Sequence, residues 1–517
     1  MKLGRRDCLR LGALATGAGT AIAAAGTGCS EAVRRATRPT AADGVTTPLP
    51  APPDGGAAAV EPMTRLVNRI SFGPVPGEVA RVGRLGAERY VEEQLHPDGQ
   101  ETPAVALRLR AHQGDVAENG MELRDFPERE VLRQLQRNAL LRAVYSRHQL
   151  RERMVDLWGN HFNIYARKGR GAYFKPADEA DVLREHALGT FPELLRASAR
   201  SPAMLAYLDN DTNQKGVPNE NYARELMELH TLGVHGGYTQ KDVQEVARCL
   251  TGWTVEDRFL RRRGSFRFDA ARHDDGQKTV LGVAIPPGGG EKDGDRVLGI
   301  LAAHPSTARF VAGKICRNFL GPDSPDTPEW TDKLAAIYAR TNGDIKAMLR
   351  PLLLSPALLA APPILKRPFD FAVSALRALN ADTDGGAGVQ EHLARMGQPL
   401  YQWPLPDGYP DATAAWSGAL LPRWNFALAL VHGEIAATNV DLEGLFGEER
   451  GADGGGVSRP VADAAIETIL ARAADAEPLA ALRRRLRERL ARRPAAAADA
   501  FAETAFLCLA SPQFQWR

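Results

Sequence analysis

Apolar residues recur at three- and four-residue spacing through most of the chain after residue 60, a period typical of amphipathic helices. The segment 128–158 shows this pattern most clearly, and segments 181–199 and 219–232 follow the same rule. Another helix is predicted over 239–250, where Thr239 and Asp242 have the spacing of a capping box. Further helices are expected at 295–303, 306–319, 331–341, 344–354, 460–493 and 495–509.

Strand signals are confined to two short segments, 265–269 with alternating Phe266 and Phe268, and 278–282. With His273 and Asp274 between them, these segments predict a small hairpin-like insertion. Residues 398–422 are rich in Pro and Trp and are expected to be irregular. The pattern therefore predicts a mainly α fold, with one large multi-helix domain over 61–517 and a small β-hairpin-like insertion.

Composition and charge narrow the classes of protein. The 517 residues are 44% hydrophobic and 25% charged, which is ordinary for a globular protein and excludes global disorder. The formal net charge is +2, so no global attraction to nucleic acid is expected, and the basic run 483–487 is interpreted as a solvated helix face. The five cysteines do not form a disulfide framework, and we expect Cys249, Cys316 and Cys508 to be buried free thiols.

The first 28 residues have the layout of an export signal. Arg5 and Arg6 precede a mildly apolar stretch rich in Ala and Gly, and this arrangement resembles a twin-arginine signal. An N-terminal anchor helix is the alternative, although Gly12, Gly17 and Gly19 would weaken such a helix. The expected location is therefore the periplasm or the cell surface.

A second N-terminal feature concerns attachment to the membrane. Small residues precede Cys29 and resemble a lipobox, although Gly26 stands where Leu is usual. Lipidation of Cys29 would tether the protein to a membrane that it does not cross. Residues 29–60 are rich in Ala, Pro, Gly and Thr and are predicted to form a flexible stalk.

The sequence has no P-loop, no dinucleotide-binding glycine motif, no serine-hydrolase elbow, no HExxH and no paired CxxC. The remaining candidates for a functional site are polar residues that lie inside otherwise apolar helices. His161 and His186 lie on apolar helix faces. In the segment 219–230, Glu225 and Asn221 border the apolar face at one edge and His230 at the other. The candidate catalytic residues are therefore His161, His186, Glu225, His230 and Asn221.

Each of these residues also has a structural interpretation. A single histidine on an apolar face is more often a hydrogen-bonded core residue than a ligand. Glu225 and His230 are about 140° apart on a helix, so they cannot chelate one ion without a second helix. The paired Glu-x-x-His motifs of helical di-iron proteins are absent, and a buried polar network or an organic-ligand site is preferred to a metal site. The sequence does not identify a cofactor.

Several short motifs are spread along the chain, at 66–74 (LVNRISFGP), 153–162 (RMVDLWGNHF), 219–233 (NENYARELMELHTLG), 237–239 (GYT), 250–253 (LTGW), 396–399 (MGQP) and 510–515 (ASPQFQ). With these segments the sequence resembles the DUF1800 family of exported bacterial proteins. The resemblance implies an exported, mainly helical protein of a family without an established activity. Members often accompany a second exported family, DUF1501, so a DUF1501-like protein is the expected partner.

Two functions from different classes follow as hypotheses. The first is an enzyme of the cell envelope that acts on a surface polymer or glycan, with Glu225 as acid or base and a histidine as its partner. The second is a non-catalytic lipoprotein that binds or scaffolds a partner enzyme, or a carbohydrate. In the second case Tyr401, Trp403, Tyr409 and Trp416 could line a binding surface, or they could be ordinary loop packing.

Overall fold

The structure, a computed structural model, describes residues 60–97, 101–113, 122–256, 264–446, 461–471, 479–492 and 497–517. The chain divides into two units, 1–48 and 49–517, and all described residues belong to the second. The predicted signal at 1–28, the lipidation site Cys29 and the stalk as far as residue 59 lie outside the described residues.

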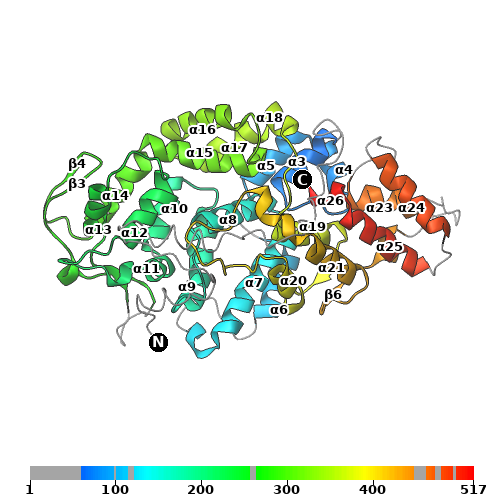
Figure 1. The fold of residues 1–517 in the computed structure, drawn as a ribbon, viewed down its shortest axis with the longest axis horizontal. Coiled ribbons are helices and arrows are strands. Elements are labelled where there is room, and N and C mark those ends of the chain that lie inside the picture. Colours follow the sequence, from blue (N-terminus) through cyan, green and yellow to red (C-terminus); the bar gives the residue numbers. More distant parts are fainter. Residues whose placement is uncertain are drawn as a thin grey trace, which may run out of the picture. The chain divides into compact units, whose positions relative to one another are not determined.

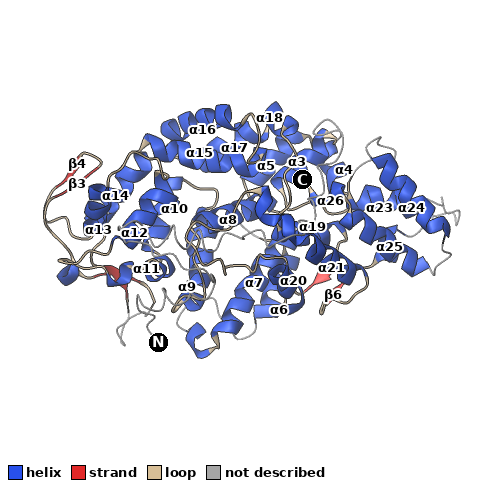
Figure 2. Cartoon of the chain, in the orientation of Figure 1, coloured by secondary structure: helices blue, strands red, loops and turns tan. Residues whose placement is uncertain are grey.

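Helices dominate the described unit, which confirms the predicted mainly α class (Figure 2). The α-helices before residue 250 are α3 (Pro62–Ile70), α4 (Glu78–Leu85), α5 (Ala87–Leu95), α6 (Pro103–Gln113), α7 (Glu128–Tyr145), α8 (Gln149–His161), α9 (Gly171–Ala177), α10 (Phe191–Arg200), α11 (Pro202–Tyr207), α12 (Glu220–Glu225) and α13 (Gln240–Cys249). Short 3-10 turns are η2 (Glu122–Asp125) and η4 (Asn210–Thr212). The predicted capping box is confirmed at Thr239 and Asp242, at the start of α13.

The segment 128–158, predicted as one run of helix, is two helices. Ser146 has an extended backbone, and its hydroxyl accepts a hydrogen bond from the backbone N–H of His148 at 3.1 Å. A serine side chain that bonds to a nearby backbone group competes with the helical hydrogen bonds, and the chain turns here between α7 and α8.

Two helices contain wide π-helical turns. The segment η3 (Asp178–Arg184) continues α9, and η5 (Leu226–Thr231) continues α12. Such turns are rare and occur frequently at functional sites. The turn η5 contains the candidate residue His230, and η3 ends two residues before the candidate residue His186.

The strands form three small antiparallel pairs. These are β1 (Trp253–Val255) with β2 (Phe266–Phe268), β3 (Lys278–Val280) with β4 (Val283–Ile285), and β5 (Asp382–Thr383) with β6 (Thr438–Asn439). The two predicted strand segments therefore do not pair with each other, as a single hairpin would require. The reason is a tight turn at Leu281 and Gly282, both with positive φ, which brings β4 back alongside β3 so that these two strands pair.

The second half of the unit is again helical. Its helices are α14 (Lys292–Ala303), α15 (Pro305–Leu320), α16 (Thr327–Thr341), α17 (Ile345–Leu353), α18 (Pro356–Ala360), α19 (Pro368–Ala378), α20 (Ala387–Arg395), α21 (Leu420–Val431), α22 (Leu442–Phe446), α23 (Val461–Ile469), α24 (Ala480–Arg492), α25 (Ala497–Ala510) and α26 (Pro512–Gln515), with 3-10 turns η6 (Ala270–Arg272) and η7 (Thr413–Ala419). Asp344 caps α17 by accepting from the N–H of Ala347 at 2.9 Å. Within the described residues, none of the helices is both long and apolar enough to span a bilayer.

The apolar core has two large parts. One is built from residues between 66 and 361, and the other mainly from α7 and residues 369–514. The predicted buried free thiols are confirmed, since Cys249 and Cys316 lie in the first part and Cys508 in the second. One cavity lies where the two parts meet, because it is lined by Val155 of the first and by Phe72 and Phe369 of the second.

Candidate functional site

The structure brings two of the predicted site residues together. His161, at the end of α8, and His230, in η5, are fully buried, and their ring centres lie 6.0 Å apart. Nε2 of His161 is 3.1 Å from the carbonyl oxygen of His230. Aromatic rings of Trp158, Phe162 and Phe191 surround His161.

The surroundings of this pair keep both imidazoles neutral. Burial lowers the pKa of His230 to about 3, and the positive charge of Lys314 acts in the same direction. Burial, Lys314 and His230 together lower the pKa of His161 well below its ordinary value. An imidazole that holds a proton so weakly is a poor general base at neutral pH, and we interpret the pair as a packing element.

Two of the other predicted residues, His186 and Asn221, have different surroundings. His186 is half-buried and Asn221 is exposed, its side chain donating to the carbonyl of Leu208 at 3.1 Å. Over the part of the chain that the structure describes, no hydrogen bond, ion pair or ring contact joins His186 or Asn221 to His161 or His230. Glu225 is buried, and its neighbours include Tyr207 and Tyr238.

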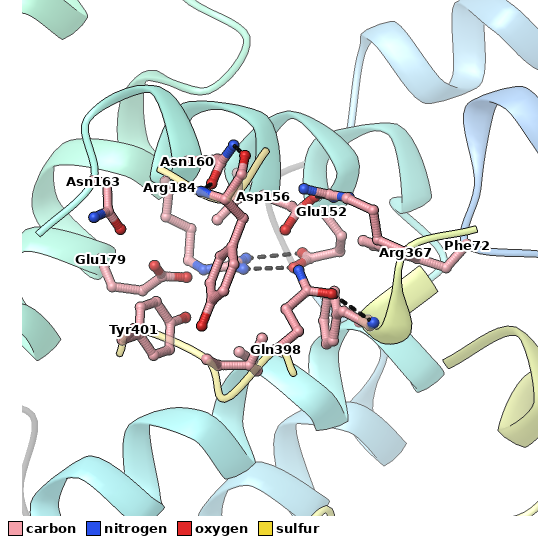
Figure 3. A pocket seen from close by; sticks show the side chains of 17 residues that line it. Phe72, Glu152, Asp156, Asn160, Asn163, Glu179, Arg184, Arg367, Gln398 and Tyr401 are labelled. Atoms are coloured by element: carbon pink, nitrogen blue, oxygen red, sulfur yellow. Dashed lines mark hydrogen bonds and ion pairs between the residues drawn. The ribbon is translucent and has the colours of Figure 1, made fainter. Parts of the chain in front are cut away.

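A cavity that the sequence did not indicate holds a denser group of polar side chains (Figure 3). Its empty volume is about 640 Å³ when the space open to solvent at its mouth is included. One face of α8 and the π-helical segment η3 supply most of its charged residues. Arg367 at the start of α19 supplies another, and the loop after α20 closes the cavity. Its charged and hydrogen-bonding side chains are Glu152, Asp156, Asn160, Asn163, Glu179, Arg184, Arg367, Gln398, Tyr401 and Tyr409.

A buried ion pair lies at the centre of the cavity. Arg184 donates two hydrogen bonds to the carboxylate of Glu152, at 2.8 and 2.5 Å, and the two residues are 8% and 5% exposed. Burial alone would raise the pKa of Glu152, but the charge and hydrogen bonds of Arg184 outweigh burial and lower it. Glu152 is therefore held in its ionised form.

Glu179 has the opposite electrostatic environment. Burial raises the pKa of this carboxyl group, although Arg184 and Lys175 act against the shift. The hydroxyl of Tyr401 lies near this carboxyl group (Figure 3), and burial and Glu179 raise the pKa of Tyr401 well above its ordinary value. Figure 3 shows the guanidinium of Arg184 between the carboxylates of Glu179 and Glu152, with Tyr401 below Glu179.

A second chain of ion pairs borders the cavity. Arg367 contacts the carboxylate of Asp156 and, at 3.2 Å, that of Asp370. Asp370 also accepts from Arg153. Burial acts to raise the pKa of Asp370, but Arg153 and Arg367 hold it well below its usual range. The carboxylates of Asp156 and Asp370 are thus both paired.

The loop over the cavity is held on the end of α8. The side chain of Asn160 exchanges two hydrogen bonds with the backbone of Tyr409, at 2.7 and 2.9 Å. Gly408 has φ +76°, and a Cβ there would lie 2.2 Å from the carbonyl oxygen of Asn160. The close approach of loop and helix therefore requires glycine at this position.

Two interpretations of the aromatic residues in this loop were made from the sequence, a binding surface and ordinary loop packing, and each describes some of these residues. Tyr409 and Trp416 are buried, and Tyr409 packs against Trp403 with ring centres 5.0 Å apart. Tyr401 and Tyr409 also line the cavity.

The signal that could have located this cavity is the repeat of acids along α8. Glu152 and Asp156 are four residues apart and share a face with Val155. Their partners Arg184 and Arg367 lie far along the chain, so the ion pairs themselves are not visible in the sequence. No group of three or more His, Cys, Asp or Glu side chains placed to hold a metal ion occurs in the described ranges.

Comparison with known families agrees with the resemblance seen in the sequence. The family described as "Protein of unknown function (DUF1800)" matches residues 65–516. Comparisons with curated proteins and with solved structures gave no match. Because the match extends over nearly all of the helical unit, the chain belongs to the DUF1800 family.

Proposed function

We propose that this protein is an enzyme in which Glu179 donates a proton to a neutral, hydroxyl-rich substrate bound in the cavity. One observation carries the proposal: two carboxyl groups of one cavity, Glu152 and Glu179, have pKa values shifted in opposite directions. Environments that separate the pKa values of two neighbouring acids are characteristic of acid–base active sites.

The roles follow from the contacts. Glu179 keeps its proton to a higher pH than an ordinary glutamate, so it can act as a general acid. Glu152 stays ionised because it pairs with Arg184, and their two hydrogen bonds hold the guanidinium beside Glu179. The hydroxyl of Tyr401 lies beside the Glu179 carboxyl group and adds to the polar surroundings of this acid.

The lining of the cavity supports a neutral polar ligand. Arg184 and Arg367 are both satisfied by carboxylates of the protein, so neither is left to bind an anionic substrate. The amide side chains of Asn160, Asn163 and Gln398 and the rings of Phe72, Phe369 and Tyr409 offer hydrogen bonds and apolar faces. A sugar unit has this combination of hydroxyl groups and apolar ring face.

The expected export signal and lipid attachment support a substrate in the cell envelope. We therefore propose a surface glycan as the substrate class and hydrolysis as the reaction. Glu179 protonates the glycosidic oxygen as its bond to the anomeric carbon breaks, and a water molecule adds to that carbon and releases a proton to solvent. The centre expected from the sequence, built on His161, His186 and Glu225, is the less favoured location, because His161 and His230 bind protons too weakly.

The test is release of product from purified envelope polysaccharide and from a set of 4-nitrophenyl glycosides. Glu179→Gln should lower turnover by roughly 10²–10⁴-fold, the usual contribution of a general acid. The matched control is Glu185→Gln, an exposed residue six positions along the same helical segment, which should leave turnover unchanged. Turnover should fall as the pH rises through the raised pKa of Glu179. Full activity of Glu179→Gln would exclude this role.

Glu225→Gln in the same assay tests the centre expected from the sequence. If Glu225→Gln abolishes turnover while Glu179→Gln does not, the active site is the one around Glu225 rather than the cavity. If neither variant changes turnover, both assignments are wrong.

The second candidate is a binding function without catalysis. The carboxylates of Glu152 and Asp156 already form ion pairs with arginines, which makes them less available as catalytic groups. This function could serve carbohydrate binding or the scaffolding of a DUF1501-like partner. Saturable binding of envelope polysaccharide by the wild-type protein, without release of any product, would favour it over the enzyme.

A further inference from the structure

We propose that the cavity described above, the first cavity, continues past Glu179 into a second cavity, and that the two together bind a chain of at least two sugar units. The second cavity lies between η2, α7 and the end of α9 with η3. Its empty volume is about 790 Å³ when the space open to solvent at its mouth is included. This inference rests on the proposed function and adds to it the length of the ligand and the position of the bond that is cleaved.

Three residues line both cavities and therefore lie between them. They are Ala139, Glu179 and Arg184. Glu179 and Arg184 belong to the π-helical segment η3, and Ala139 belongs to α7. We call this place the junction. Ala139 brings only a methyl group to the junction, which leaves more room for a ligand to extend from one cavity into the other than a larger side chain would.

Helix α7 extends along both cavities. Figure 1 shows α7 beside α9, the helix that η3 continues, and these two helices are in contact. Ala143 lines the first cavity, and the residues of α7 that line only the second are Val131, Gln134, Leu135, Asn138 and Arg142. These positions follow the three- and four-residue spacing of one helix face. One face of α7 therefore leads from the first cavity into the second.

The second cavity offers the same kinds of contact as the first. Gln134 and Asn138 supply side-chain amides, and Nε2 of Gln134 donates to Oδ1 of Asn138 at 2.9 Å. The side-chain N–H groups of Asn138 have no acceptor among the described residues, so they can donate to a ligand. Apolar surface comes from Leu123, Val131, Leu135 and Pro176. Amide groups beside apolar surface suit the hydroxyl groups and the ring face of a further sugar unit.

The charged residues at the junction belong to both cavities. The second cavity adds Arg142 to Glu179 and Arg184. The positive charge of Arg142 acts to lower the pKa of both Glu152 and Glu179, so Arg142 belongs to the same group of interacting charges as Arg184. Among the described residues, Glu179 is the one Asp or Glu that lines both cavities.

The junction is the place where the bond between two sugar units would lie. With one unit in each cavity, the glycosidic oxygen that joins them is at the junction, next to the carboxyl group of Glu179. A general acid must come within hydrogen-bond distance of the atom that it protonates. The position of Glu179 therefore favours cleavage between two bound units, as in an oligosaccharide, over release of a single sugar from a small leaving group.

The chemical step is the hydrolysis proposed above. The unit on one side of the junction leaves with the oxygen that Glu179 has protonated. The anomeric carbon of the other unit takes the hydroxyl group of water, and the remaining proton of that water goes to solvent. Glu179 regains its proton from solvent before the next cycle.

The experiment measures how binding depends on the length of the ligand. The probes are fragments of envelope polysaccharide, cut by partial acid hydrolysis and separated by length from one unit to about six. Titration calorimetry of the full chain carrying Glu179→Gln gives the affinity for each length without cleavage. We expect two or three units to bind roughly tenfold more tightly than one, since the second unit fills the second cavity, and further units to add little.

Two variants, each made in the Glu179→Gln chain, test the route past the junction. Ala139→Leu should reduce the gain in affinity from the second unit, because its larger side chain narrows the junction. Asn138→Ala removes an amide of the second cavity and should weaken binding of two units roughly three- to tenfold more than binding of one, which is the effect of about one hydrogen bond. Asn138→Ala serves if Ala139→Leu does not fold. The matched controls are Ala339→Leu, at an exposed alanine of α16, and Arg133→Ala, at an exposed residue of α7, and both should bind every length with unchanged affinity.

The outcomes separate this inference from the proposed function. Equal affinity for one unit and for longer fragments, no binding of any fragment, or an unchanged dependence on length in both cavity variants would overturn the inference. If the wild type releases product from single-unit glycosides but longer fragments bind no better, the proposed function stands and the extended site is wrong. If longer fragments bind better but the wild type releases no product, the extended site stands and the proposed catalysis is wrong.

Discussion

Removal of Arg184 should destabilise the protein strongly and in a pH-dependent way. In the variant Arg184→Gln, the carboxylate of Glu152 stays 5% exposed and loses both hydrogen bonds from the guanidinium. Breaking a buried ion pair by removing one partner costs roughly 3–5 kcal/mol. The matched control Arg309→Gln breaks an ion pair with Asp332 in which both side chains are more than half exposed, so it should cost no more than about 1 kcal/mol.

The dependence on pH identifies the cause of the loss. In the wild type the folded pKa of Glu152 is lowered, so its contribution to stability is present above the unfolded pKa and is lost as pH falls through the folded pKa. Without Arg184, burial raises the folded pKa instead. The loss of unfolding free energy in Arg184→Gln should therefore be greatest at pH 8 and smaller at pH 5. The difference is about 1.4 kcal/mol for each unit by which the folded pKa of Glu152 in the variant lies above 5.

The assay is urea unfolding of wild type, Arg184→Gln, Glu152→Gln and the double variant at pH 5 and pH 8. The double variant should be more stable than Arg184→Gln by roughly 1–4 kcal/mol, because it carries no uncompensated buried charge. A loss below about 1 kcal/mol for Arg184→Gln at pH 8, or a double variant no more stable than this single one, would refute the reasoning.

Three other outcomes are expected. His230 should cost the wild type about 2 kcal/mol of stability between pH 7 and pH 5, because its folded pKa of about 3 keeps it unprotonated in the folded protein, whereas the unfolded chain takes up this proton below about pH 6.5. In the variant His230→Phe this part of the pH-dependent loss should be absent. Urea unfolding at both pH values measures the difference. Gly408→Ala should cost roughly 1–3 kcal/mol through its positive φ and the contact with Asn160, and faster hydrogen exchange at the Tyr409 amide would locate the effect, whereas unchanged exchange would contradict it. The buried thiols, whose pKa values burial raises to about 11–12, should resist iodoacetamide in the folded protein and react in urea, as mass spectrometry would show for each: Cys249, Cys316 and Cys508.

Local signals in the sequence predicted most helices, because apolar periodicity and capping act over a few residues. Thr239 and Asp242 are an example, since the capping box seen in the sequence is the one that starts α13. The break between α7 and α8 was not predicted, because it depends on one side-chain hydrogen bond at Ser146 inside a segment that keeps its helical period.

Strand pairing was predicted only in part. The strand tendency of residues 265–269 and 278–282 was correct, but each segment pairs with a neighbour rather than with the other. Partner choice depends on the turn geometry at Leu281 and Gly282, which the alternation of residues does not show.

The sequence by itself determined the mainly α class, the positions of most helices and the membership of the family, because these depend on local periodicity and on motifs that can be read in order. Only the tertiary structure decided which charged groups meet. Glu152 and Arg184 come from two helical segments, and Asp156 and Arg367 come from α8 and the start of α19. Burial and pairing set the pKa of each group, and both are properties of the packed fold rather than of any stretch of sequence.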